Sequence, residues 1–460
     1  MGFFQDPQVG LVQTPQSFYN PDPIARNLGL EDVLTPEEEV FYRQIQRVRD
    51  GAGAVVCAGT SFVMRRSALE SIGGFVTEAV SEDFFTGIQL AAQGYRLVYL
   101  NEKLSAGLAA ENIAAHALQR VRWEQGTLQA FFIKSNPVTI PGLTPVQRLA
   151  YFEGLIHWFS SIARVGFLIM PLAYAFLGII PMRATEVELL YFFLPFYLVQ
   201  LSAFSWLNYR SRSALLSDVY SLVLAFPLAV TVFQVMVRPF SKGFKVTPKG
   251  TASDRYHFNW VLAWPLVLVF GLTALSLWIN LGHCLMTMAS PVAHWRGLGI
   301  GWLWSGYNLI MLGLALLILL DAPRPSPYEW FNLRRVAKLQ ITTPVAAEVE
   351  LTKADTLPEG SDTGQAMTLE LVDEHCTLPS QLVKQWTEEG LPVLTLQFDS
   401  LDLPQQRRLT ELLFCRPGQW QSRCSPNEVQ SLWLILKSLV RPRFLTNRHL
   451  QPKPVILTRG

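Results

Sequence analysis

A carboxylate pair and a short basic and aromatic stretch are the residues of this chain best suited to group-transfer chemistry. Glu82 and Asp83 stand in TEAVSEDFFTG, where either carboxylate could take a proton from an attacking hydroxyl as a general base. Gln119, Arg122 and Trp123 follow in HALQRVRWEQG. An arginine holds phosphate oxygens bidentately, and an indole face suits the apolar face of a sugar ring. The second stretch therefore predicts a site for a diphosphate and a sugar.

Each stretch also has an ordinary structural explanation, which the residues alone leave open. Glu82 and Asp83 open a helical pattern, where the helix dipole favours acidic residues. The basic stretch fits a solvated helix face with one buried tryptophan. A third stretch, GFKVTPKG at 243–250, has flanking glycines and two lysines that can meet phosphate, but it also fits a basic loop beside a membrane.

The first part of the chain, residues 1–150, alternates short β-rich runs with helical patterns. Runs such as VGLVQT, AVVCAGTSFVM and RLVYL alternate with TPEEEVFYRQIQRVRD and EDFFTGIQLAAQG. Alternation of this kind is typical of an α/β domain in which helices pack on a sheet.

The second part, residues 151–325, is expected to form an α-helical transmembrane region. Half of the chain is hydrophobic and only 16% is charged, which is lean for a soluble protein. A span needs about 18 apolar residues, and five runs approach or exceed that length. They lie at 165–182, 189–209, 219–237, 260–281 and 297–320.

Loop charge predicts which of these runs cross the membrane. The segment 210–255 is rich in lysine and arginine, whereas the short loops near 183–188 and 282–296 hold one arginine each. The positive-inside rule then puts that segment in the cytoplasm and the two loops outside. A helix near 214–237 must enter and leave on one side, and Pro227 fits such an interfacial helix. Four true spans are expected; five would place KGFKVTPKG outside.

The third part, residues 328–460, follows a change of composition after DAPRPSP. The runs KLQITTPV, MTLELVDE and PVLTLQF predict a small β-rich soluble domain, and EVQSLWLILKSLV predicts a helical tail. The five cysteines are scattered without a C-x-x-C pair, so neither a zinc site nor a disulfide framework is indicated. A net charge of +2 does not imply a nucleic-acid partner.

Taken in order, five stretches resemble the catalytic subunit of bacterial cellulose synthase, a processive family 2 glycosyltransferase. They are VQTPQSFYNPDP (12–23), CAGTSFVMRR (57–66), SED (81–83), QRVRW (119–123) and FKVTPKG (244–250). The resemblance runs through nearly the whole chain. It implies a multidomain membrane protein with a partial GT-A α/β glycosyltransferase domain and an interface helix over 1–150, an α-helical transmembrane bundle over 151–325 and a PilZ-like β-barrel over 328–460.

The resemblance also implies roles for single residues. Asp83, preceded by Glu82, would be the general base for the acceptor hydroxyl. Gln119 and Arg122 would help to hold the donor diphosphate, and Trp123 would stack on the acceptor end of the glucan. Two further groups complete the set: Thr60 and Ser61 along the acceptor end, and a gating loop with Phe244, Val246, Thr247 and Lys249 that would cover the donor nucleotide.

The implied reaction is the inverting transfer of glucose from UDP-glucose to the non-reducing end of a β-1,4-glucan, coupled to translocation of the polymer. The implied location is the inner (plasma) membrane, with the glycosyltransferase part and the C-terminus in the cytoplasm. The lipid bilayer and a polymer-receiving accessory subunit are the expected partners. Two alternatives stay open: a synthase of another β-glycan (mannan, mixed-linkage glucan or chitin-like polymer), and a truncated, inactive membrane fragment.

Two departures from the family concern its ligands. The family binds Mg²⁺ or Mn²⁺ through an aspartate pair, D-x-D, placed before QTP, and nothing similar precedes Gln13. No metal ligand is therefore expected in this chain, which looks like the C-terminal part of such an enzyme. If Met1 is the native start, the isolated chain is not expected to turn over donor.

The second departure lies in the motif that binds cyclic di-GMP in PilZ domains. RRVAK contains Arg334 and Arg335 but ends in Lys338 where arginine is usual. DEHCTL begins with Asp373 but has His375 and Leu378 where serine and glycine are usual. Lysine does not reproduce the stacking and forked hydrogen bonds of arginine, so weak or no binding of cyclic di-GMP is expected.

Overall fold

The computed structural model describes most of the chain and divides it into two compact units. The first comprises Met1–Pro325 and Ser422–Asn447, and the second comprises Ser326–Gln421 and Arg448–Gly460. The helical tail expected in the C-terminal domain therefore belongs to the first unit. The described residues are 2–179, 186–241, 243, 247–248, 253, 255–288, 298–324, 337–341, 365–372, 375–388, 391–415 and 420–445.

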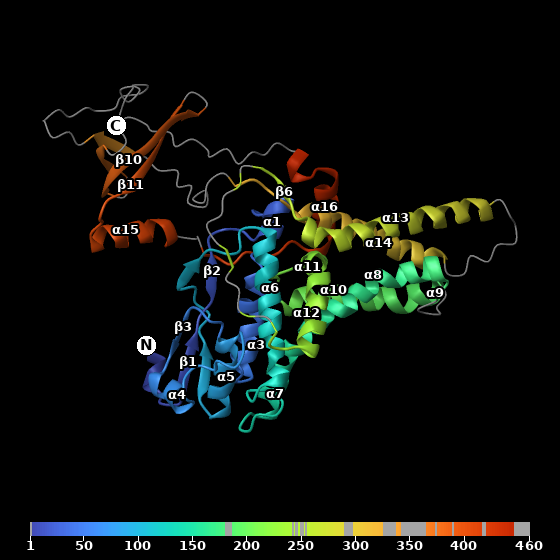
Figure 1. The fold of residues 1–460 in the computed structure, drawn as a ribbon, viewed down its shortest axis with the longest axis horizontal. Helices are drawn as coiled ribbons and strands as arrows, with labels where there is room; N and C mark the ends of the chain where they lie inside the picture. Colours follow the sequence, from blue (N-terminus) through green and yellow to red (C-terminus); the bar gives the residue numbers. More distant parts are fainter. Residues whose placement is uncertain are drawn as a thin grey trace. The chain divides into compact units, whose positions relative to one another are not determined.

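A three-stranded sheet lies at the centre of the α/β part of the first unit, in the order β3–β1–β4 (Figure 1). Strand β1 (Val9–Gln13) is buried along its whole length. It pairs in parallel with β4 (Arg96–Tyr99) and antiparallel with β3 (Phe62–Met64). A second sheet joins β2 (Gln16–Phe18) and β5 (Ser105–Gly107) in parallel.

The β-rich run at 54–64 forms a strand only at its end. Further upstream, side chains rather than a neighbouring strand satisfy the backbone. The Gln46 amide accepts a hydrogen bond from the backbone N–H of Val56 and donates one to its carbonyl, while Gln13 accepts from the N–H of Ala58. Because these buried backbone groups already have hydrogen-bond partners, the segment before Phe62 does not need to pair with a neighbouring strand.

In the described part of the chain, seven α-helices lie between Pro23 and Ile156, and several begin at side chains suited to capping. Asn112 accepts a hydrogen bond from the N–H of Ala115, and Thr144 forms a capping box with Gln147. The helices are α1 (Pro23–Leu28), α2 (Glu38–Val40), α3 (Gln46–Gly51), α4 (Arg66–Ser71), α5 (Glu82–Ala92), α6 (Ile113–Leu128) and α7 (Pro145–Ile156).

The core of this part joins the sheet to α5 and α7. Leu11 and Leu97 from the strands pack with Phe85 and Ile88 from α5 and with Tyr151 from α7, and all are essentially inaccessible to water. Burying one such aliphatic or phenyl side chain contributes about 1.5–3 kcal/mol. This packing holds the first turn of α5, where Glu82 and Asp83 lie, against the sheet.

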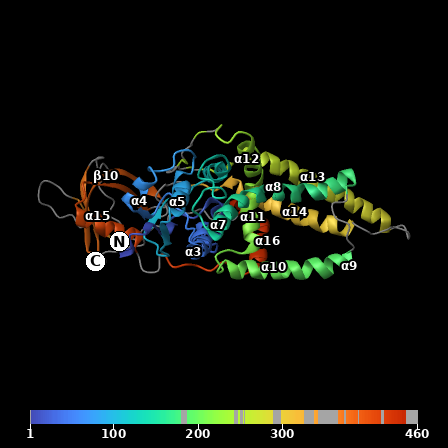
Figure 2. The same ribbon diagram turned by 90° about the horizontal axis from the view of Figure 1, so that it is seen from below.

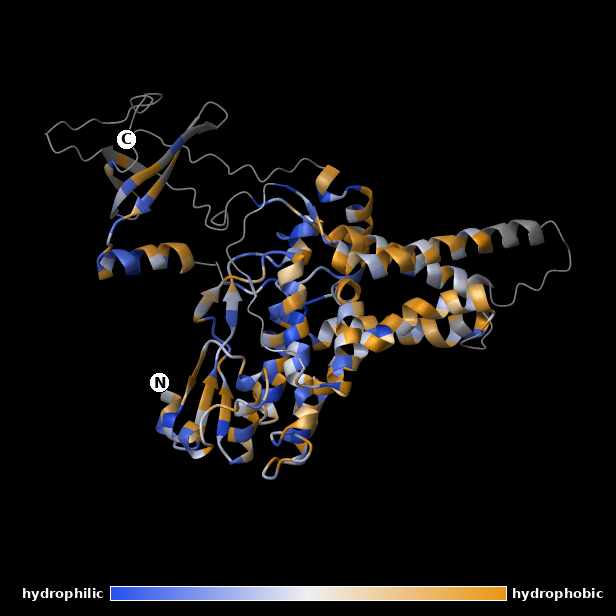
Figure 3. Ribbon diagram, in the orientation of Figure 1, coloured by the Kyte–Doolittle hydropathy of each residue, from blue (hydrophilic) through white to orange (hydrophobic). Residues whose placement is uncertain are grey.

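Among the residues that the structure describes, four helices of the first unit are long and apolar enough to cross a membrane, at Pro145–Leu177, Leu190–Leu207, Trp260–Ile279 and Gly301–Ile318. Hydrophobic residues dominate them (Figure 3). They contain α8 (Ser160–Leu177), α10 (Leu194–Leu207), α13 (Trp260–Met288) and α14 (Leu298–Ile318); the short α9 (Glu186–Glu188) precedes α10. Helices α8, α13 and α14 pack on one another, whereas Figure 2 shows α10 apart from these three helices.

A bent pair of helices, α11 (Ala214–Val223) and α12 (Ala225–Val237), lies between the second and third of these segments. The two halves meet at 62°. As one broken span the pair would raise the count among the described residues to five, whereas a re-entrant pair would leave it at four. Pro227 falls in the first turn of α12, where its missing N–H leaves no hydrogen bond unmade. Asp218 of α11 is ion-paired with Arg164 of α8 and accepts a hydrogen bond from Tyr307 of α14 at 2.6 Å.

The second unit contains a four-stranded antiparallel sheet in the order β11–β10–β9–β8, followed by helix α15 (Leu403–Phe414). Its strands are β8 (Ala337–Ile341), β9 (Ala366–Leu371), β10 (Cys376–Glu388) and β11 (Leu391–Phe398). This sheet agrees with the β-rich composition but does not by itself define a PilZ-like barrel. Arg334, Arg335 and Asp373 lie outside the described residues, while Lys338 is in β8.

Candidate active site

Asp83 lies in the first turn of α5, facing a glycine-containing loop. Its Oδ1 accepts a hydrogen bond from the N–H of Phe84 at 2.8 Å. Gly59 has a φ of +70°, and a Cβ built on it would lie 2.5 Å from Oδ2 of Asp83. Only glycine combines this backbone conformation with so close an approach, so Gly59 leaves the carboxylate room beside the loop.

The surroundings of Asp83 suit a general base. Partial burial of the carboxyl group and the neighbouring charge of Glu82 raise its pKa to about 6, while Arg122 works in the opposite direction. The pKa of Arg122 is lowered, chiefly because its guanidinium is partly buried, although both carboxylates oppose this shift. A carboxyl group that titrates near pH 6 is mostly ionised at neutral pH yet basic enough to accept a proton.

Gln13, at the end of β1, fixes the loop that carries Thr60 and Ser61. Its fully buried amide donates a hydrogen bond to the carbonyl of Thr60 at 2.8 Å and accepts one from the N–H of Ala58 at 2.9 Å. Ser61 has a positive φ of 56°, a conformation uncommon for a residue other than glycine. Its carbonyl accepts hydrogen bonds from both the N–H and the hydroxyl of Thr14, so the loop is held on both sides.

Helix α6 brings the basic stretch to the start of α5 through a close contact at Gly126. A Cβ at Gly126 would overlap the hydroxyl of Ser81 and lie 3.0 Å from its backbone nitrogen. Three residues further on, Gln129 accepts a hydrogen bond from the N–H of Val80 at 2.8 Å and donates one to the carbonyl of Pro239. These contacts place the face of α6 that carries Arg122 beside Glu82 and Asp83.

Arg120, the other guanidinium of the stretch, is part of the scaffold. It donates a hydrogen bond to Glu37 at 2.6 Å, and its guanidinium lies 4.5 Å from the ring centre of Trp123. Burial would raise the pKa of Glu37, but the positive charges around it, Arg120 first, lower it to about 2. His116 lies 3.5 Å from the same carboxylate, and burial lowers its pKa to about 4.

Trp123 keeps an exposed surface beside this ion pair. It is 39% accessible although one face receives Arg120. The structure is therefore compatible with a ring open to a flat ligand, and it does not bear out a fully buried tryptophan. Gln119 is half-buried one turn earlier on the same helix.

Glu124 is a residue that the sequence patterns did not single out. It is fully buried, and neither carboxylate oxygen has a hydrogen-bond partner among the described residues. It shares a helix face with Leu128, which packs against Val232 and Val235 of α12. Burial raises its pKa to about 9, so the side chain is a neutral acid at pH 7. The sequence gives one hint of it: Glu124 is an ionisable residue on the same stretch as Trp123 and Gly126.

Two predicted parts of the site, the gating loop and the metal ligands, are not found together with Asp83 and Arg122 in the described residues. In the gating loop, Phe244, Val246 and Lys249 are outside the described residues, and Thr247 is buried. Within the described part of the chain, no group of three or more His, Cys, Asp or Glu side chains could hold a metal ion. The residues present therefore do not fit the family's Mg²⁺ or Mn²⁺ site, and the prediction that its ligands lie elsewhere stays a prediction.

The structure thus combines an α/β part that carries a carboxylate, an arginine and an exposed tryptophan with helices that are long and apolar enough to cross a membrane. A family model described as glycosyl transferase family group 2 matches residues 1–320, and the chain belongs to this family. Its N-terminal part thus has a GT-A-like glycosyltransferase fold, as the sequence resemblance indicated.

Similar curated proteins are named as cellulose synthases. The catalytic subunit (UDP-forming) of Pseudomonas fluorescens (strain SBW25) is 30% identical over 431 residues, covering 91% of this chain and 57% of that protein. The cellulose synthase 1 catalytic subunit (UDP-forming) of Komagataeibacter xylinus is 28% identical over 473 residues, covering 97% of this chain and 62% of its own length. This chain thus spans about three fifths of these relatives, and the sequence-based resemblance is confirmed.

Among solved structures, a mannosyltransferase from Pyrobaculum calidifontis in complex with GDP-Man and Mn²⁺ matches with a TM-score of 0.32 and 16% identity. The match covers 50% of this chain and 55% of the mannosyltransferase.

Gly126 offers a direct test of how α6 sets the site. We expect Gly126→Ala to push α6 away from Ser81 and so misplace Arg122 relative to Asp83. Since a displacement of about 1 Å can cost as much as about 100-fold in rate, sugar transfer in native membranes should fall sharply. Gly166→Ala is the matched control, because a Cβ at that helical glycine meets nothing within 4 Å. Equal activity of both variants would contradict the assignment.

Proposed function

We propose that this chain is part of a membrane glycosyltransferase that transfers glucose from UDP-glucose to the non-reducing end of a β-1,4-glucan. The observation that carries the proposal is the half-buried Asp83 with a pKa near 6, faced by Arg122, whose neighbour on α6, Trp123, keeps an exposed ring. The similarity to proteins named as UDP-forming cellulose synthases supports the choice of donor and product.

The proposed reaction is a single displacement with inversion at the sugar carbon. The carboxylate of Asp83 takes the proton from the acceptor 4-hydroxyl, whose oxygen forms a bond to C1 of the donor glucose. The bond between C1 and the UDP oxygen breaks, and UDP leaves with the electron pair. Arg122 and Gln119 hold the diphosphate, and Trp123, with Thr60 and Ser61, lines the acceptor end. The gating loop covers the nucleotide.

A divalent ion, Mg²⁺ or Mn²⁺, belongs to the proposal for the complete enzyme, where it would offset the charge of the leaving diphosphate. Because the described residues offer no matching ligand set, no step is assigned to it here.

The long apolar helices support a multi-pass protein of the inner membrane. The positive loops favour a cytoplasmic glycosyltransferase part, so that the polymer would leave through the helices. A polymer-receiving accessory subunit is proposed from the family resemblance.

We also propose that the second unit is a PilZ-like domain in which the motif that binds cyclic di-GMP is only partly kept. Leu378, where the motif has glycine, is buried and pairs with Leu369 in the sheet, which supports weak or no binding of cyclic di-GMP.

The product distinguishes glucan synthesis from synthesis of another β-glycan. We expect membranes that carry the native protein to convert radiolabelled UDP-glucose into polymer that a β-1,4-glucanase digests fully. Asp83→Asn should lower incorporation by roughly 10²–10⁴-fold, because the base is lost while shape is kept. Polymer resistant to the β-1,4-glucanase but cleaved by a mannanase, lichenase or chitinase would instead select the alternative product.

The pH dependence of transfer reports the base itself. Because Asp83 acts as its ionised form, the rate should rise with pH and level off above a pKa of about 6. Below it, the rate should fall about tenfold per pH unit. Glu82→Gln removes a charge that raises this pKa, so the acid limb should move to lower pH. If the acid side of the pH–rate profile of Glu82→Gln coincides with that of the unmodified chain, a group other than Asp83 controls it.

Cyclic di-GMP binding can be measured directly on the full chain. We expect isothermal titration calorimetry in detergent to show no binding in the micromolar range, since Lys338 stands where the motif has arginine. Lys338→Arg together with Leu378→Gly is the restoring variant. Micromolar or tighter binding by the unmodified chain would refute the proposal.

A further inference from the structure

Helix α16 (Glu428–Val440) carries two apolar faces on opposite sides. Its buried face consists of Ser431, Leu434, Ile435 and Ser438. Its other face, called here the α16 stripe, consists of Val429, Leu432, Trp433, Leu436 and Val440, whose exposed fractions run from 43% to 78%. The spacing of the stripe, i, i+3, i+4, i+7 and i+11, places it along a single helix face without a charged residue. An exposed apolar surface of this kind marks a site of interaction.

The stripe is a fixed surface, because both ends of α16 are anchored to the first unit. At its start, the carboxylate of Glu428 accepts hydrogen bonds from the N–H groups of Ala214 and Leu215, at 2.7 and 3.1 Å, and so caps α11. Beyond its end, buried Arg443 contacts Glu31 at 2.8 Å and the carbonyl of Arg26.

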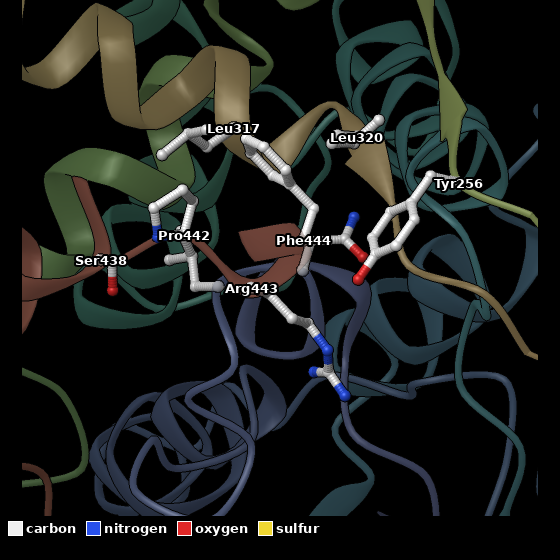
Figure 4. Close-up of a pocket in the computed structure, with 9 residues that line it drawn as sticks. Tyr256, Leu317, Leu320, Ser438, Pro442, Arg443 and Phe444 are labelled. Carbon is white, nitrogen blue, oxygen red and sulfur yellow. The ribbon is translucent and has the colours of Figure 1, made fainter. Parts of the chain in front are cut away.

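Apolar packing completes the anchor at the C-terminal end. Figure 4 shows Phe444 beside Leu317, in the last turn of α14, and Leu320, just after this helix, around a small pocket that Tyr256 also lines. This pocket belongs to the attachment of α16 and contains none of the candidate catalytic residues.

Helix α16 packs beside a candidate membrane span: Leu434 and Ile435 of its buried face cluster with residues of α14, and the partly buried Leu439 lies next to them. Leu439 lies 3.5 Å from the Cβ position of Gly313, which Phe270 of α13 also approaches, at 3.7 Å. Gly313 lies inside the apolar segment Gly301–Ile318 and, at 1.5 Å per residue, about 7–8 Å before its end. Helix α16 therefore contacts the flank of the membrane helices as well as their ends.

We propose that the α16 stripe inserts into the lipid bilayer, so that α16 is an interfacial helix of the membrane part. Lipid is the occupant that fits, because the neighbouring α13 also exposes apolar side chains, among them Val261 at 80%, Trp264 at 62% and Leu268 at 55%. The opposite face of α16 belongs to the same hydrophobic cluster as buried residues of α13 and α14, among them Leu266 and Leu312, so the stripe lies on a helix attached to these apolar segments. A helix with an exposed apolar face in that position can lie in the plane of the interface.

The charges around the stripe agree with this orientation. Lys437 lies 4.7 Å from the ring centre of Trp433, a geometry in which the ammonium can reach lipid headgroups while the indole stays at the interface. Arg441 follows one turn later, at the end of the helix. Both are suited to the phosphates of anionic lipids.

Depth-dependent quenching tests the insertion on the full chain in nanodiscs of phosphatidylcholine and phosphatidylglycerol. The five native cysteines are replaced, and a single cysteine at Leu436 or Val440 carries an environment-sensitive fluorophore. We expect nitroxide-labelled lipids to cause a marked loss of its fluorescence and a water-soluble nickel chelate to cause little. Ser431→Cys is the buried control, which neither quencher should reach, and Arg408→Cys on α15 is the aqueous control.

Two results would overturn the proposal. Quenching of the stripe by the nickel chelate alone would place it in water. Quenching by neither reagent would show that a second copy, or another part of the chain, covers it.

A second experiment uses the unsubstituted chain, because a cysteine-free variant could fail to fold. Photoactivatable lipids in the same nanodiscs should label the peptide that contains residues 429–440. Absence of that label, with labelling of α13 peptides as the positive control, would count against insertion.

Discussion

The close approach of α6 to the start of α5 is the contact on which the candidate site depends. Gly126 has no side chain, and Ser81 fills the space that a Cβ would occupy. Arg122 can therefore act on the same carboxyl group that the sheet and α5 hold in place. Without this contact, the start of α5 and the middle of α6 would be two unrelated helix segments. With it, residues almost forty positions apart share one electrostatic environment.

The two arginines of QRVRW serve opposite sides of one helix. Residues two positions apart on an α-helix point about 200° away from each other, so Arg120 and Arg122 cannot face the same ligand. Arg120 turns to Glu37 and fixes how α6 lies on the segment before α2, whereas Arg122 turns to Glu82 and Asp83. The dense basic stretch thus combines an anchor and a candidate ligand-binding group. Trp123, between the two faces, is supported by one arginine and stays open to solvent.

Local patterns in the sequence predicted a large part of this arrangement. Alternating runs indicated the α/β part, apolar runs indicated the long helices, and the acidic and basic stretches indicated where chemistry would lie. What they could not supply were partners distant in sequence: Gln13 for the loop at Thr60, Glu37 for Arg120, and Ser81 for Gly126. Those contacts depend on how whole elements pack, which periodicity within one segment does not specify. The same limit explains the helical tail, whose pattern indicated a helix but not that it packs with the first unit.

Glu124 couples the burial of α6 to the binding of a proton. An exposed glutamate in an unfolded chain is ionised above a pH of about 4.3, whereas the buried carboxyl group keeps its proton up to a pKa of about 9. Burying this side chain as the chain folds near neutral pH therefore takes up one proton from solvent. Since the folded state binds more protons than the unfolded state, this one carboxyl group makes folding less favourable as pH rises between these values. A side chain that takes no part in the proposed chemistry thus gives the fold around α6 a dependence on pH.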